Sequence, residues 1–97
     1  MKYEIIVILT SELNSNDLNV WAFDFGKSLK RVNASEISIV SYGKRKLKYP
    51  IRDKGRGNFI QVNFNILPDY LEQLSSNLNL DVNVLRFLVL NKNYKKF

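Results

Sequence analysis

The sequence predicts an α+β fold, a four-stranded antiparallel sheet with two helices on one of its faces. Segments with strand alternation and segments with helical spacing follow one another in the order β-α-β-β-α-β. The chain has 97 residues, of which 45% are hydrophobic and 25% are charged, and this matches one compact domain over residues 1–97. Right-handed crossovers close such an order into the ferredoxin-like sandwich.

The first strand and the first helix are predicted from apolar patterns. Tyr3–Thr10 is rich in β-branched side chains and apolar on both faces, which is typical of a central strand. Ser15 and Asn16 then offer N-cap chemistry for a helix, in which Gly26 predicts close packing against the sheet. The apolar stripe of this helix has spacings of three and four and consists of Leu18, Ala22, Phe25, Leu29 and Val32. Trp21 lies at the border of the stripe, and we interpret it as packing at the edge of the core.

A hairpin is predicted in the middle of the chain. Glu36–Pro50 has the pattern of a long strand, and Gly43 interrupts it where a bulge is the simplest explanation. Ile51–Gly57 is polar and charged, and we expect it to connect two strands. In Asn58–Ile66 apolar and polar side chains alternate, which predicts the third strand.

The second helix and the last strand complete the order. Pro68 stands at the first helical turn, a position that proline favours. The apolar repeat of this helix consists of Leu67, Leu71, Leu74 and Leu78. Val84–Leu90 is the predicted last strand, and residues 91–97 form a polar, basic C-terminal tail. Strands one and three are expected at the centre of the sheet, and one sheet face is expected to stay open.

The composition excludes several kinds of site. Cysteine and histidine are absent, which removes disulfides, Cys or His metal ligands, thiol nucleophiles and imidazole bases. The carboxylates form no facing pair except Asp69 and Glu72, which suit the first turn of the second helix. We therefore expect no enzymatic activity, no cofactor, no metal and no small-molecule substrate. The apolar run near the N-terminus is too short for a signal peptide or a membrane span, so no membrane partner is expected.

The charge pattern favours a polyanionic partner. The formal net charge is +6 and the pI is about 9.7, and RNA or DNA is the leading partner for such a balance. Seven cations fall within thirteen residues of the hairpin: Lys44, Arg45, Lys46, Lys48, Arg52, Lys54 and Arg56. Tyr42, Tyr49 and Phe59 lie among or beside them and are suited to stacking on bases. The alternative is a solvated hairpin whose charges protect the strand edges from aggregation.

Two arginines pose a further question, because strand alternation places both beside apolar neighbours. Arg45 shares a face with Leu47, so its guanidinium needs a carboxylate such as Glu4, an RNA phosphate, or a path to the sheet rim. Arg86 is expected on the open sheet face, where it either binds RNA or is solvated. The same face would present polar side chains of the central strands to solvent or to a partner: Glu4, Gln61, Asn63 and Asn65.

The segment Tyr42–Ile51, followed by Gly57–Phe59, resembles the signature of the bacterial-type small-subunit ribosomal protein six family (S-six). The shared pattern is an aromatic or Leu, a Gly, a basic pair, a Leu and then Tyr-Pro-Ile. Tyr3, Pro68 and Arg86 also match, so the resemblance covers nearly the whole chain.

This resemblance implies a non-enzymatic protein that binds small-subunit rRNA of the central domain as a heterodimer with small-subunit ribosomal protein eighteen. By this resemblance Arg45 and Arg86 are the residues expected to contact RNA or the companion protein. Together with the charge pattern, the expected rRNA ligands are the seven hairpin cations and Arg86. The residues expected to contact the companion protein are Glu4, Tyr42, Phe59, Gln61, Lys92 and Tyr94. The alternative is a protein-protein adaptor that uses the open sheet face without direct RNA binding.

The composition also bears on the compartment. Twelve Asn, ten Lys and eight Ile against two Ala indicate AT-rich codon usage, as in a small genome. Such a gene, translated without a transit peptide, predicts a ribosomal protein of the plastid (chloroplast) stroma. The alternative is the cytoplasm of an AT-rich bacterium.

Overall fold

The computed structural model of the chain describes residues 1–51 and 54–92, and it confirms the predicted fold. The elements are β1 (Lys2–Thr10), α1 (Ser15–Arg31), β2 (Ser35–Ile51), β3 (Lys54–Asn65), the 3-10 turn η1 (Pro68–Tyr70), α2 (Leu71–Leu80) and β4 (Val84–Asn91). Neither described helix combines the length and the apolar character that a membrane crossing requires.

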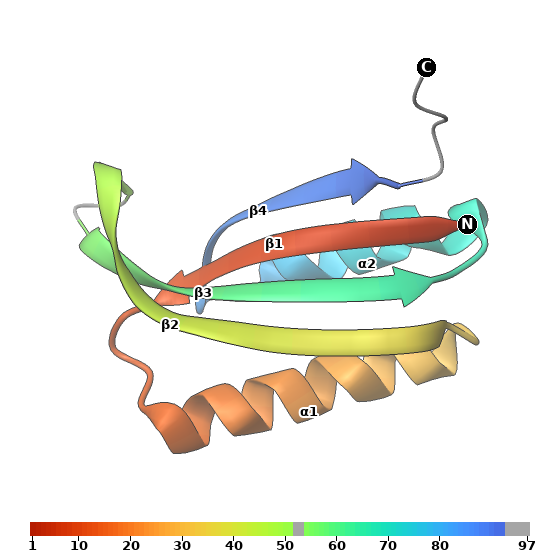
Figure 1. Cartoon of the computed structure of the whole chain (residues 1–97), viewed down its shortest axis with the longest axis horizontal. Coiled ribbons are helices and arrows are strands. Elements are labelled where there is room, and N and C mark those ends of the chain that lie inside the picture. Colours follow the sequence, from red (N-terminus) through yellow and green to blue (C-terminus); the bar gives the residue numbers. More distant parts are fainter. Residues whose placement is uncertain (52–53, 93–97) are drawn as a thin grey trace.

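The strands form one antiparallel sheet in the order β2-β3-β1-β4, so β1 and β3 are central, as predicted (Figure 1). Their register is continuous from the pair Lys2 and Asn65 to the pair Thr10 and Gly57. β4 pairs with the other edge of β1, with one irregularity between Ile8 and Leu9. The uninterrupted central pairing makes β1 and β3 the rigid frame on which both faces of the sheet are built.

The core lies between the sheet and the two helices. On β1 the alternate side chains Tyr3, Ile5, Val7 and Leu9 are buried, and the side chains between them point to the opposite face. Phe25 and Leu29 of α1 and Leu74 and Leu78 of α2 belong to the same buried cluster. Both helices therefore cover one face of the sheet, and the described residues leave the other face open.

The first helix begins one residue earlier than the sequence pattern indicated. Asn14, not Ser15 or Asn16, is the N-cap: its side chain accepts from the Asp17 backbone at 2.8 Å, and the Asp17 carboxylate accepts from the Asn14 backbone at 3.1 Å. This reciprocal capping box needs an acidic or amide side chain three residues after the cap. Asn14 has Asp17 there, whereas Ser15 has Leu18, and Asn16 already lies inside the helix that begins at Ser15.

Two packing expectations on the helices were wrong. A Cβ on Gly26 would lie 3.9 Å from Ile39 Cδ1, which is ordinary contact, so no close approach to the sheet requires glycine there. Leu67 is 63% exposed, because it precedes the turn Pro68–Tyr70 and lies outside the helical repeat. Leu74 and Leu78 are buried as predicted.

The hairpin departs from expectation in the length of its strands. The bulge near Gly43 is confirmed: the register shifts between Ser41 and Gly43, and Gly43 has φ +79°. The connection expected over Ile51–Gly57 was wrong, because β2 runs to Ile51 and β3 starts at Lys54. Backbone pairing carries a two-stranded ribbon through this segment although its side chains are polar.

Candidate nucleic-acid and protein interface

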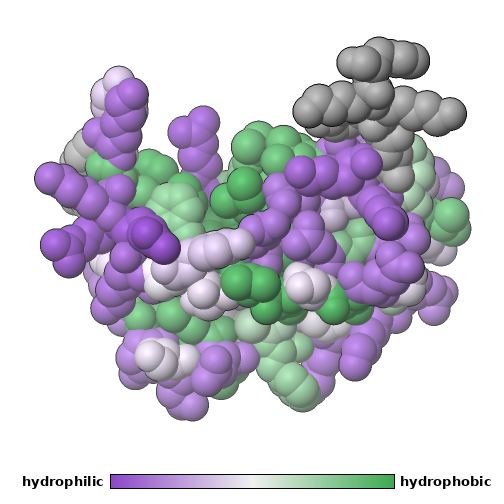
Figure 2. Space-filling model, viewed as in Figure 1, coloured by the Kyte–Doolittle hydropathy of each residue, from purple (hydrophilic) through white to green (hydrophobic). Residues whose placement is uncertain are grey.

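The β2–β3 hairpin carries the densest positive charge of the described chain. The ribbon bends out of the sheet on the side away from α1 (Figure 1), and hydrophilic side chains project from that end of the molecule (Figure 2). Five of the predicted cations are described there with exposed side chains: Lys44, Arg45, Lys46, Lys48 and Arg56. Lys54 opens β3, and Arg52 lies outside the described residues.

The buried side chain of Leu47 determines which side of the hairpin faces the sheet. Leu47 is only 9% exposed, although every described neighbour from Lys44 to Tyr49 is exposed. A Cβ on Gly57 would come 3.7 Å from Leu47 Cδ2 and 2.5 Å from Ile8 Cγ2, so these side chains crowd over a position that only glycine fits. Leu47 thus packs toward Ile8 on the open face, and alternation turns Lys44, Lys46 and Lys48 the other way.

Arg45 is held by the hairpin itself. Its Nε donates to the Tyr42 backbone carbonyl at 3.2 Å, and the side chain is exposed. Glu4, one of the partners considered for Arg45, pairs instead with Gln61 and Lys92. Among the described residues, the Tyr42 carbonyl is the one acceptor bound to Arg45, and it occupies one of five guanidinium N–H donors. The other donors can then meet a phosphate.

A polar ladder crosses the open sheet face from one edge to the other. The Tyr42 hydroxyl on β2 donates to Gln61 Oε1 on β3 at 2.6 Å, and Gln61 Nε2 donates to Glu4 Oε1 on β1. Lys92, just beyond β4, lies 3.7 Å from Glu4 Oε2. Four residues assigned from sequence to one protein contact are therefore neighbours, and Glu4 is buried beneath them with 8% exposure.

Apolar side chains surround this ladder. Ile6, Ile8 and Phe59 are half-buried, and Val40 and Leu88 are 40% and 55% exposed. Leu88 pairs with Ile6, and Arg86 pairs with Ile8, so the exposed Arg86 lies on this face as predicted. Sequence reasoning did not assign Val40 of β2 or Leu88 of β4 to this surface; for Leu88 the signal was a last strand that is apolar on both faces.

We call this region the open sheet face and define it by Tyr42, Gln61, Glu4 and Lys92 with the apolar side chains Ile6, Ile8, Val40, Phe59 and Leu88. It combines a hydrogen-bonded polar line with exposed aliphatic surface, a composition suited to a protein contact. Tyr94, the remaining residue assigned to this contact, lies outside the described residues.

The chain is similar to known proteins in both sequence and structure. The family model "Ribosomal protein S6" matches residues 2–91. The small ribosomal subunit protein bS6c of Trieres chinensis is 52% identical over 94% of this chain and 95% of its own length. The bS6c protein of Phaeodactylum tricornutum is 47% identical over 94% of this chain and 93% of its own length. The crystal structure of 30S ribosomal protein S6 from Thermotoga maritima shares the fold, with a TM-score of 0.84 over 92% of this chain and 84% of that one at 19% identity.

Proposed function

The chain belongs to the ribosomal protein S6 family, and from this premise we propose that it binds central-domain rRNA of a plastid small ribosomal subunit together with small-subunit protein eighteen. The observation that carries the RNA part is the projecting hairpin with its exposed cations. The companion protein is assigned to the open sheet face. The protein then has a structural role in ribosome assembly, without a catalytic site.

The hairpin is suited to RNA because the charges of its Lys44–Lys48 stretch are exposed, closely spaced and of one sign. No acidic residue occurs between Ile37 and Arg52, so every charge of this stretch is positive. Lysines on one side of the ribbon offer point charges to phosphates, and the mostly unoccupied Arg45 guanidinium offers a planar fork. Arg86 extends the cationic surface onto the sheet.

The open sheet face is suited to a protein contact because the polar side chains of its ladder already bind one another. The ladder fixes the Glu4 carboxylate and the Gln61 amide in place, so a partner meets a pre-ordered surface. Val40 and Leu88 then supply exposed apolar surface, and burying this surface against a partner stabilises the complex.

The plastid assignment rests on the relatives and on composition. Both bS6c relatives, the plastid type of the family, come from diatoms and match nearly the full length of this chain. The Asn-, Lys- and Ile-rich composition agrees with a gene of a small AT-rich genome. We place the protein in ribosomes of the chloroplast stroma.

The RNA contact is tested by filter retention of central-domain rRNA across a salt series, with the companion protein present. The triple variant Lys44→Gln, Lys46→Gln, Lys48→Gln should weaken binding and reduce the slope of log affinity against log salt by about two units. The matched control removes three charges from α1, with Lys27→Gln, Lys30→Gln and Arg31→Gln, and should keep the slope. An unchanged slope in the hairpin variant, or equal losses in both variants, would rule out specific phosphate contacts at the hairpin.

The same assay without the companion protein separates the two functions weighed from the sequence. Salt-sensitive retention that strengthens when the companion is added supports joint binding to RNA. Tight companion binding with no enhancement of RNA retention supports the adaptor, which the exposed Val40 and Leu88 favour.

A further inference from the structure

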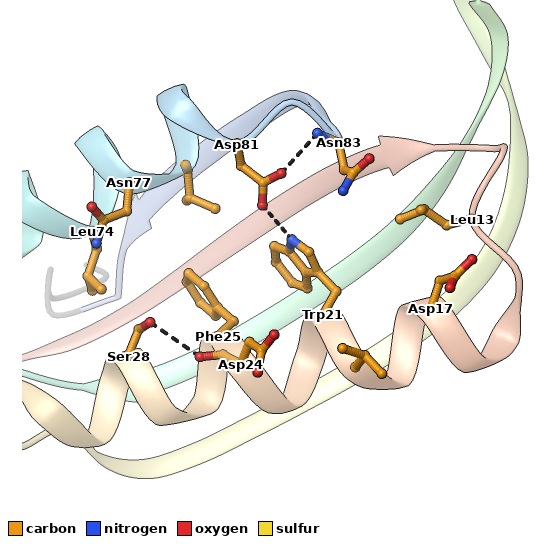
Figure 3. Close-up of a pocket in the computed structure, with 12 residues that line it drawn as sticks. Leu13, Asp17, Trp21, Asp24, Phe25, Ser28, Leu74, Asn77, Asp81 and Asn83 are labelled. Carbon is orange, nitrogen blue, oxygen red and sulfur yellow. Dashed lines mark hydrogen bonds between the residues drawn. The ribbon is translucent and has the colours of Figure 1, made fainter.

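A groove between α1 and α2 lies on the side of the sheet opposite to the open sheet face (Figure 3). Its volume is about 520 Å³, within the range of roughly 300–1,000 Å³ typical of ligand sites. Trp21 and Phe25 come to it from α1, and Leu74 and Leu78 come from α2. Neither the proposed RNA contact nor the companion contact uses this surface.

The aromatic part of the groove is rigidly held. Trp21 stacks on Phe25 with ring centroids 5.2 Å apart and planes 8° from parallel. The indole Nε1 donates to Asp81 Oδ2 at 2.8 Å, and the Asn83 backbone donates to Asp81 Oδ1 at 2.9 Å. The predicted packing of Trp21 at the core edge agrees with this geometry. Since the indole is only half-buried, it also offers apolar surface to an occupant.

The groove is acidic in a strongly basic protein. Asp17 and Asp24 line it from α1 and Asp81 from the α2 side, and no Lys or Arg is among its described lining residues. Between Arg56 and Arg86 the chain has no cation at all, although its net charge is +6. These carboxylates do not come together as a metal site among the described residues.

The three carboxylates differ in what they already bind. The Asp17 carboxylate accepts from the Asn14 backbone N–H, and both oxygens of Asp81 accept hydrogen bonds. Within the described part of the chain, the Asp24 carboxylate has no hydrogen-bond or ion-pair partner, and it is exposed. It stands one turn from Trp21 on the same helix face, the spacing at which side chains are neighbours. An unpaired anion therefore lies beside apolar aromatic surface.

We infer that this groove docks a cationic amphipathic segment of a partner protein, with an Arg or Lys at Asp24 and an apolar side chain against Trp21 and Val20. Val20 is 54% exposed at the groove and suits such a contact. RNA is disfavoured, because its phosphates would meet three carboxylates and no cation. A small neutral ligand would leave Asp24 unpaired, whereas a guanidinium forms charge-assisted bonds with it.

The only tryptophan of the chain reports on this groove directly. We would titrate the full chain with a Trp-free amphipathic peptide of leucine and arginine and follow Trp21 fluorescence. Saturable change is expected, with no change for the matched peptide in which glutamate replaces arginine. Asp24→Lys should weaken peptide binding about tenfold, and Asp69→Lys, the same charge reversal on η1 outside the groove, should change it less than about twofold.

Several outcomes would overturn the inference. These are an unresponsive Trp21, an equal response to the glutamate peptide, and equal losses for Asp24→Lys and Asp69→Lys. Saturable quenching by an oligouridine would make the groove an RNA surface, and emission that changes with protein concentration alone would identify a second copy as the occupant. Asp24→Asn, which keeps the size of the side chain, repeats the test if the lysine variant misfolds. The triple hairpin variant should bind the peptide as the unchanged chain does, which separates this surface from RNA binding.

Discussion

Both faces of β1 carry apolar side chains, but these side chains are buried to different extents on the two faces. Tyr3, Ile5, Val7 and Leu9 are at most 5% exposed under the helices, whereas Ile6 and Ile8 on the open face are only half-buried. On the covered face these side chains pack against apolar side chains of α1 and α2. On the open face two hydrogen bonds, from Tyr42 to Gln61 and from Gln61 to Glu4, and the ion pair between Glu4 and Lys92 hold the buried Glu4 in place.

An apolar side chain on a strand therefore does not always belong to the buried core. The aliphatic side chains of the open face remain accessible around a pre-ordered polar line, which is the arrangement expected of a surface kept for a partner. The covered face should therefore control stability, and the open face should control association. Four substitutions test these two roles.

The largest effect is expected on the covered face, at Leu29. This side chain is fully buried, so Leu29→Ala removes packing and leaves a cavity, and should lower the free energy of unfolding by about 3 kcal/mol. Leu80→Ala is the matched control, because Leu80 is 81% exposed; it should change stability by less than about 0.5 kcal/mol. Urea denaturation measures both. Similar values for the two variants would mean that the helix layer does not carry the core.

The next effect is expected where the open face is most crowded, at Gly57. Gly57→Ala would place a Cβ 2.5 Å from Ile8 Cγ2 and 3.3 Å from the Leu9 carbonyl, neither of which moves freely. Stability should fall by about 2 kcal/mol. Gly55→Ala two residues away meets nothing within 4 Å and should be nearly neutral. Thermal unfolding of the pair would contradict this packing if both variants melted alike.

A smaller effect is expected from cutting the polar ladder at its centre. Gln61→Met removes the donor to Glu4 and the acceptor of Tyr42, and should cost about 1 kcal/mol of stability. Affinity for the companion protein should fall as well, because Glu4 loses its fixed position. Asn63→Met on the same face, with no side-chain hydrogen bond among the described residues, is the control. Calorimetric titration that finds equal companion affinity in the two variants would show that the ladder does not order this contact.

The smallest effect is a gain on the covered side, at Gly26. Because a Cβ would make ordinary contact with Ile39, Gly26→Ala should raise the unfolding free energy by about 0.7 kcal/mol through higher helix propensity. The contrast is Gly43→Ala, which should lose stability because Gly43 has φ +79°. If guanidinium denaturation showed that Gly26→Ala lowers the unfolding free energy, the helix would be closely packed at Gly26 after all.

The fold could be predicted because its signals are local. Alternation over Asn58–Ile66, the leucine repeat of α2 and the bulge at Gly43 each arise from backbone geometry within a few residues. Errors came where a local signal was ambiguous. The cap at Asn14 depended on a reciprocal bond with Asp17, and the polar ends of β2 and β3 pair through their backbones.

For the candidate site, too, the sequence predicted some features and not others. The cluster of hairpin cations can be counted in the sequence, because they are adjacent along the chain. The carboxylate of Glu4 could not be assigned its partners, since Gln61 and Lys92 are 57 and 88 positions away in the numbering. Alternation placed Arg45 beside Leu47, but its bond to the Tyr42 carbonyl depends on the local bend of the ribbon.

The sequence by itself determined the order of elements, the central place of β1 and β3, the basic hairpin and the family, because these follow from periodicity, charge and short motifs. Packing in three dimensions set which apolar residues stay exposed, how the polar ladder links β2, β3 and β1 to Lys92, and that Asp17, Asp24 and Asp81 line one groove with Trp21. The physical reason is that each of these depends on distances between segments remote in the chain, which the packing of α1 and α2 on the sheet sets and local patterns do not encode.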